Sequence, residues 1–89
     1  MALRIEKVEA LTVGTTAQDV AVNFAGFIIA NNSANAVYFK EKNGTACTTS
    51  NGFCVPAGKV LDKVFTAQTL SVVADGASSD VRILFVDET

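Results

Sequence analysis

The chain has 89 residues, of which 49% are hydrophobic and 18% charged, and its formal net charge is −2. The length allows one domain, residues 1–89, and the lack of any run of Lys or Arg disfavours proteins that bind nucleic acid through clustered positive charge. No apolar stretch approaches the roughly 18 residues of a transmembrane helix, and charges stand where a signal peptide needs its apolar stretch. We therefore expect no membrane contact and synthesis in the cytoplasm.

Turn signals recur at short intervals along the chain, and β-branched and aromatic runs lie between them. In chain order we expect strands at residues 3–13 (one long strand, or two joined at a kink), 19–24, 27–30, 36–42, 60–65, 69–74 and 80–86, with 45–49 and 52–55 as short arms of a further loop or hairpin. This rhythm predicts an all-β fold, a small antiparallel β-sandwich or barrel of about seven or eight short strands.

The first expected strand changes its alternation along its length. Leu3 and Ile5 share one face, Val8 and Ala10 take the other, and Leu11 returns to the first. Because the side-chain period of a strand is two, such a change of parity often marks a β-bulge. We therefore expect a bulge in this strand.

Three turns between the expected strands have distinct signals. Asn43-Gly44 is a strong hairpin signal, and the Pro-Ala-Gly run at 56–58 marks another turn. The acidic run at 75–80 lacks the ligand pattern of an EF-hand calcium loop. We interpret residues 75–79 as a hairpin turn between the last two strands, in which Asp and Ser cap backbone N–H groups.

Several expected strands are apolar on both faces. Ile28 lies between two apolar neighbours, Val73 follows another valine, and Leu84 and Val86 alternate with apolar residues. A two-layer sandwich normally shows one polar face per strand, and this chain has no expected helix to cover a second apolar face. A tightly closed barrel with scattered surface apolar residues would explain the pattern. Burial against neighbouring subunits explains it better, because the chain is also poor in charge, against about 25% in average globular proteins. We expect a homo-oligomer.

The residues that commonly carry chemistry are scarce. The chain has no His, which removes the commonest general base and metal ligand, and its two cysteines are too few for a structural zinc site. Cys47 and Cys54 could close a disulfide across the loop between them or remain free thiols, and the sequence leaves both open. We therefore expect no enzyme, no catalytic residue, no metal site and no cofactor.

A series of turn and core signals extends over residues 11–86. They are Leu-Thr-Val-Gly-Thr-Thr-Ala at 11–17, Ile-Ile-Ala-Asn-Asn-Ser at 28–33, Ala-Val-Tyr at 36–38, Thr-Ser-Asn-Gly-Phe at 49–53, Val-Pro-Ala-Gly at 55–58, Leu-Ser-Val-Val-Ala-Asp-Gly at 70–76 and Asp-Val-Arg-Ile-Leu at 80–84. This order resembles small β-sandwich virion proteins of tailed bacteriophages, including head decoration (cement) proteins and domains of head or tail fibres. The resemblance implies a multimeric component of the virion, made in the host cytoplasm, that binds the major capsid protein or a neighbouring virion protein.

Two functions follow as expectations. The first is a capsid decoration protein that stabilises the head by burying apolar strand faces between subunits or on the capsid. The alternative is a carbohydrate-binding module of a virion fibre, although the chain has no Trp and one Tyr. Aromatic residues are enriched in interface cores. The interface residues expected on this ground, with one aliphatic neighbour, are Phe24, Phe27, Ile28, Tyr38, Phe53 and Phe65.

Overall fold

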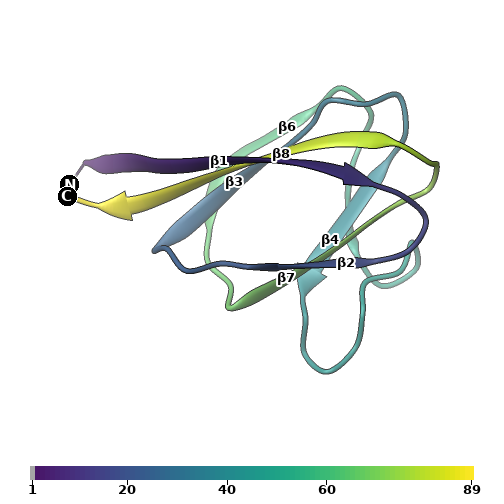
Figure 1. Ribbon diagram of the computed structural model, residues 1–89, viewed down its shortest axis with the longest axis horizontal. Helices are drawn as coiled ribbons and strands as arrows, with labels where there is room; N and C mark the ends of the chain where they lie inside the picture. Colours follow the sequence, from purple (N-terminus) through teal and green to yellow (C-terminus); the bar gives the residue numbers. More distant parts are fainter. Residues whose placement is uncertain (1) are drawn as a thin grey trace.

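The computed structural model describes residues 2–89 and is a sandwich of two antiparallel four-stranded sheets (Figure 1). The predicted small all-β sandwich is confirmed. Residues 2–89 contain no helix, and so none that is long and apolar enough to cross a membrane. The strands are β1 (Leu3–Val13), β2 (Gln18–Ala21), β3 (Gly26–Asn31), β4 (Val37–Glu41), β5 (Phe53–Val55), β6 (Val60–Phe65), β7 (Thr69–Ala74) and β8 (Ser79–Glu88).

The two sheets differ in which parts of the chain they contain. The first sheet has the order β1-β8-β3-β6, and the second has the order β2-β7-β4-β5. β1 and β8 pair along their whole lengths, from Leu3 opposite Glu88 to Val13 opposite Ser79. The two ends of the chain therefore lie side by side at one end of the sandwich (Figure 1). At the side of the sandwich away from β1 and β2, the edge strands are β6 and β5.

The core fills the space between the sheets with the inward residues of nearly every strand. Buried residues alternate with less buried ones over residues 27–31 of β3 and 79–85 of β8, as the period of two requires, whereas every residue of β7 after Thr69 is buried. The largest fully buried apolar side chains are Phe27, Phe85, Ile29, Leu70, Ile83, Val13, Val37, Val72 and Val81. No buried side-chain polar atom among the described residues lacks a hydrogen-bond partner. The inward faces of the two sheets thus account for the stability of the fold.

The bulge expected in the first strand is confirmed. Ile5 lies opposite Val86 and Lys7 opposite Phe85, so that Glu6 is the extra residue. The bulge brings Val8 onto the same outward face as Ile5, since Val8 lies opposite Leu84. As a consequence, Ile5 and Val8 belong to one continuous outward face, although the alternation in the sequence places them on opposite faces.

Residues 42–52 depart from the sequence-based expectation. Residues 45–49 form no strand, and Asn43-Gly44 closes no two-residue hairpin, although Gly44 has the positive φ of 78° that a turn needs. Local bonds hold the segment as a loop: Thr48 Oγ1 accepts hydrogen bonds from the backbone N–H groups of Ser50 and Asn51. These side-chain bonds compete with strand pairing, as Thr and Asn commonly do.

The turn at 75–79 is also different from the one predicted. It connects β7 in the second sheet to β8 in the first, so it crosses between the sheets and closes no hairpin. Both strands already have two neighbours within their own sheets, which leaves no free edge for them to pair with each other. Of the expected capping, the part that concerns Asp is confirmed, because Asp75 Oδ1 accepts the backbone N–H of Ala36 at 3.1 Å. The hydroxyl group of Ser79 instead donates to the carbonyl oxygen of Gly76 at 3.2 Å.

Candidate interaction surfaces

The large hydrophobic side chains that remain exposed gather at two places. Five of them lie on the outward face of the first sheet: Leu3, Ile5, Val8, Val60 and Val64. The other two, Phe53 and Phe65, lie at the side of the sandwich where β5 and β6 are the edge strands. Scattered single exposures would need no explanation, whereas clustered ones mark interaction sites.

The first place, here called the apolar face, is the outward side of β1, β8, β3 and β6. Its exposed members are the five residues just named, and Ile5 and Val8 are 67% and 58% exposed. Leu84 joins them across the sheet, because it lies opposite Val8 on one side and opposite Ile28 on the other. Leu84 and Ile28 are half-buried. The strands that are apolar on both faces therefore direct one of those faces to this outward side, which is open to solvent in the single chain.

Gly26 extends the apolar face onto β6. A Cβ at this position would lie 2.5 Å from Val64 Cγ1 and 3.0 Å from the carbonyl oxygen of Phe65. The first distance is shorter than real Cβ contacts and the second is unusually tight, so a side chain at this position would push β6 away from the sheet. Val64 consequently packs over the sheet next to Val86, which is itself 4% exposed.

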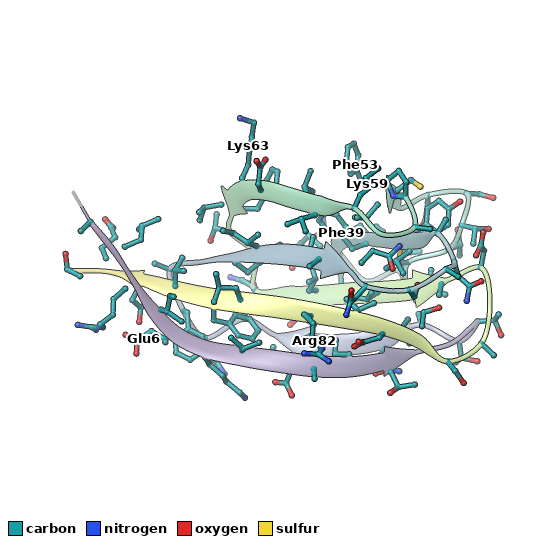
Figure 2. The ribbon with its side chains drawn as sticks, turned by 90° about the horizontal axis from the view of Figure 1, so that it is seen from above. Glu6, Phe39, Phe53, Lys59, Lys63 and Arg82 are labelled. Atoms are coloured by element: carbon teal, nitrogen blue, oxygen red, sulfur yellow. The ribbon has the colours of Figure 1, made fainter. Side chains whose placement is uncertain are left out.

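One end of the apolar face is charged. Arg82 lies opposite Ala10 and Ala30, and its Nε is 2.9 Å from Asp80 Oδ1. The hydrogen bonds from Arg82 lower the pKa of Asp80, and the same bonds raise the pKa of Arg82. Except for Val60, which lies opposite Ala30 and so in the row of Arg82, the exposed apolar residues occupy the half of the sheet near the chain ends. Arg82 lies on β8 beyond them (Figure 2).

The second place is a cleft of about 360 Å³ between the edges of the two sheets, here called the phenyl cleft. Its residues are Phe27, Phe39, Lys40, Glu41, Asn51, Phe53, Phe65, Thr66, Ala67 and Leu70. Phe39 lies at the centre, with ring centroids 6.2 Å from Phe27, 6.0 Å from Phe53 and 6.5 Å from Phe65. In Figure 2, Phe39 lies deeper than Phe53, which stands at the outer edge with Lys59 and Lys63.

The polar groups around the phenyl cleft already have partners within the chain. The two carboxylate oxygens of Glu41 accept the backbone N–H groups of Gln68 and Thr69, each at 2.9 Å. These bonds lower the pKa of Glu41. Lys40 Nζ donates to the carbonyl oxygen of Thr45, and Asn51 Oδ1 accepts the backbone N–H of Thr48. What the cleft offers to a ligand is therefore mainly its aromatic and aliphatic surface.

Asn31 closes the sandwich at the other end of the same side. Its side-chain nitrogen donates to the carbonyl oxygens of Asn35, Val55 and Pro56 at 2.7, 2.9 and 3.2 Å. Its backbone N–H donates to the carbonyl oxygen of Lys59 at 2.8 Å. Since Asn31 belongs to the first sheet and Val55 to the second, one buried amide connects both sheets, and the phenyl cleft is the part of this side that stays open.

The centre of the outward face of the second sheet is covered by the chain itself, whereas Asp19 and Cys54 on its edge strands are exposed. Val73 is 4% exposed, and its neighbour Ser71 accepts the backbone N–H of Cys47 through Oγ at 2.8 Å. The 42–52 loop therefore packs over this sheet, and the interpretation that Val73 needs a neighbouring subunit is wrong. Cys47 is buried and Cys54 exposed, and both are free thiols. Burial raises the pKa of Cys47.

Four of the six interface residues expected from the sequence lie at these two places. Phe53 and Phe65 both line the phenyl cleft, 63% and 38% exposed, and Ile28 belongs to the apolar face. Phe27, only 1% exposed, is a core residue at the floor of the cleft, so its assignment to an exposed interface is wrong. Its inward position follows from the alternation of β3.

Two other expected interface residues lie outside both surfaces. Phe24 is half-buried, and its ring centroid is 5.2 Å from that of Phe85. Tyr38 is half-buried on the outward face of the second sheet, opposite Cys54, and the charge of Cys54 raises the pKa of Tyr38.

The members of the apolar face that lie on β1 and β6 were missed from the sequence. They are aliphatic, and the expected interface residues were chosen mainly among the aromatic ones. The signal that could have identified them is the pairing of outward Ile5 and Val8 on an edge strand with the second apolar side of 83–86. Comparison with known proteins adds nothing to the surfaces, because no family model, curated protein or solved structure matches the chain.

Proposed function

We propose that the chain is a structural protein of a tailed-bacteriophage virion, a decoration protein that stabilises the head through contacts between its own copies and with the major capsid protein. The observation that supports this proposal is the apolar face. It is an open apolar sheet face on a chain that covers the centre of its other sheet with a loop. The sequence resemblance supplies the virion context.

The size of the apolar face fits a contact with other subunits. Four strands about 4.8 Å apart, with about 3.3 Å per residue, give a flat area on the order of 500 Å². A specific interface uses about 800 Å² of accessible surface per partner, and an uneven surface exceeds its flat projection. The flat area includes the charged end with Arg82, so the outward side of the first sheet as a whole can supply roughly half of one standard interface.

The energy available argues for assembly on a lattice. Full burial of an exposed Val, Leu or Ile contributes about 1.5–3 kcal/mol, so five half-exposed residues contribute on the order of 5 kcal/mol. Association of two free molecules costs about 4–15 kcal/mol before any gain appears. Pairs of free copies are thus weak, whereas a copy that contacts several neighbours on a capsid binds firmly through their combined effect.

Gradient sedimentation of virus particles tests the proposal. Particles from cells that express the chain should carry it in the fractions that contain the major capsid protein. A double variant, Ile5→Lys with Val8→Lys, should stay in the soluble fractions, because two buried ammonium groups would oppose the contact. The matched control is Thr49→Lys with Ser50→Lys on the exposed loop over the second sheet, which should sediment like the wild type.

The result that overturns the proposal has two parts. The wild-type chain would be absent from the particles, and analytical ultracentrifugation would show a strict monomer at every concentration. Circular dichroism of both double variants checks that they fold, so that loss of contact is separated from loss of structure.

The carbohydrate-binding alternative has less support. Phe53 is an exposed ring beside polar groups, as a sugar site requires, but Glu41, Lys40 and Asn51 already hold partners within the chain. Sugars are bound by hydrogen bonds to their hydroxyl groups, and these side chains have little capacity left for them. A glycan array that shows saturable binding abolished by Phe53→Ala would reverse this preference.

A further inference from the structure

We propose that the phenyl cleft binds an apolar side chain, aromatic or branched aliphatic, from an extended acidic segment of another protein, and that this segment lies along the free edge of β6. The cleft is separate from the apolar face, and the inference holds whether or not the chain belongs to a virion.

The shape of the cleft favours a single side chain as the inserted group. Phe53 and Phe65 flank Phe39 on two sides, and the floor is formed by Phe27 and Leu70, which are each 1% exposed. A volume of about 360 Å³ is at the lower end of the roughly 300–1,000 Å³ of ligand pockets, which leaves room for one or two side chains. A ring inserted between Phe53 and Phe65 would contact three phenyl rings at once.

The backbone of β6 can position that side chain. The N–H of Asn31 donates to the carbonyl oxygen of Lys59, so the odd-numbered residues of β3 direct their backbone groups toward β6. Phe27 pairs with Phe65 in this ladder, and the N–H and C=O groups of Val64 and Thr66 consequently point to the open edge. A strand added there would place its residue opposite Phe65 between the sheets, where the cleft lies. Strand addition to an exposed edge is a recurring mode of peptide recognition.

The charges on β6 specify the flanks of the segment. Lys59 and Lys63 stand at this edge with Phe53, and Lys63 projects away from the body of the molecule (Figure 2). The acidic groups nearby are Asp62, also on β6, and Glu41, whose oxygens face two backbone N–H groups. Opposite charges on facing strand positions stabilise pairing, so an Asp or Glu two residues from the apolar residue, opposite Lys63, is favoured.

Nuclear magnetic resonance of the ¹⁵N-labelled full chain tests the inference with a defined probe. The probe is a blocked pentapeptide, Asp-Val-Phe-Val-Asp, and its control carries Ser in place of Phe. We expect saturable chemical-shift changes of the Phe53, Phe65 and Thr66 amides with the Phe peptide but not with the Ser control. The Thr66 amide should also exchange its hydrogen more slowly, because strand addition would bond this amide and insertion of a side chain alone would not.

Variants assign the effect to the cleft. Phe53→Ala should weaken binding about tenfold, the upper range for loss of one aromatic pair. Lys63→Glu should also weaken binding, and its effect on the affinity should be larger in low salt than in high salt. Phe65→Ala repeats the test on the opposite wall. Ile5→Ala, an equally exposed position on the apolar face, should leave the affinity unchanged.

Three results would each overturn the inference. They are an absence of shifts up to the solubility limit of the peptide, equal shifts with the Ser control, and shifts confined to the apolar face.

Discussion

Replacement of Asn31 tests whether one buried amide holds the two sheets together. In Asn31→Ala, the carbonyl oxygens of Asn35, Val55 and Pro56 lose their shared donor, and Ser33 loses the acceptor of its N–H and Oγ. A net hydrogen bond contributes about 0.5–1.5 kcal/mol, and an unsatisfied buried group costs about 1–3 kcal/mol. Because only the bond to Val55 is fully buried, we expect a loss of about 3 kcal/mol.

That loss is large for this domain. A chain of this length has an unfolding free energy of about 5–13 kcal/mol, so the variant should show a clearly lower urea midpoint with an unchanged slope. Urea unfolding followed by circular dichroism measures the difference. The matched control is Asn43→Asp or Asn43→Ala in the exposed 42–52 loop, which should change stability by less than about 0.5 kcal/mol. A loss below about 1 kcal/mol for Asn31→Ala would refute the role of the amide as a tie between the sheets.

Asn31→Asp adds a dependence on pH to the same test. The introduced carboxyl group would face carbonyl oxygens in a buried site, and burial and repulsion favour its protonated form, so its folded-state pKa lies above the unfolded value of about 3.9. The contribution of the introduced carboxyl group to the free energy of unfolding is then fully present below about pH 3.9 and is lost as pH rises through the folded-state pKa. Stability relative to Asn31→Ala should fall with rising pH, and a flat profile would contradict the described geometry.

Three further predictions address single groups. Gly26→Ala should destabilise the fold by about 1–3 kcal/mol in urea unfolding, since its Cβ would collide with Val64 on β6, and an unchanged midpoint would contradict that contact. A thiol reagent should label Cys54 at once and Cys47 only on unfolding, and equal rates would show that the 42–52 loop does not cover the second sheet. Hydrogen bonds lower the folded-state pKa of Glu41, so the carboxylate stabilises the fold above its ordinary pKa of 4.5, and this stabilisation is lost as pH falls through the folded-state pKa. In thermal melts over a series of pH values, Glu41→Gln should not show this loss at acid pH. A variant that loses stability at acid pH as the wild type does would refute the prediction.

Local patterns in the sequence identified the strands well and their partners less well. Residues 60–65 and 69–74 are strands with the expected bounds, because alternation and β-branched content are local properties. Residues 69–74 and 80–86 also alternate alike and lie close in sequence, yet they belong to different sheets. Pairing is decided by which other strands compete for each edge, and that information is spread over the whole chain.

The surfaces were harder to predict for a related reason. Aromatic residues are favoured both in cores and in interfaces, so Phe27 and Phe53 were grouped together although one is buried and the other exposed. The local run Asn31-Asn32-Ser33 is typical of a polar turn, and only the arrangement of both sheets shows that the Asn31 amide is buried among carbonyl groups. The two-sided apolar pattern was the most informative signal, and it identified the apolar face through Ile28 and Leu84.

The unequal covering of the two sheets sets a limit on growth. If both outward faces were open and apolar, molecules could stack layer on layer without end, as in fibrils. Here the 42–52 loop packs over the centre of the second sheet, where Ser71 and Val73 are buried, so contact through the apolar face leaves no second apolar sheet face open among the described residues. Stacking therefore ends after two layers, and a surface coated by this chain presents the loop and its polar side chains outward.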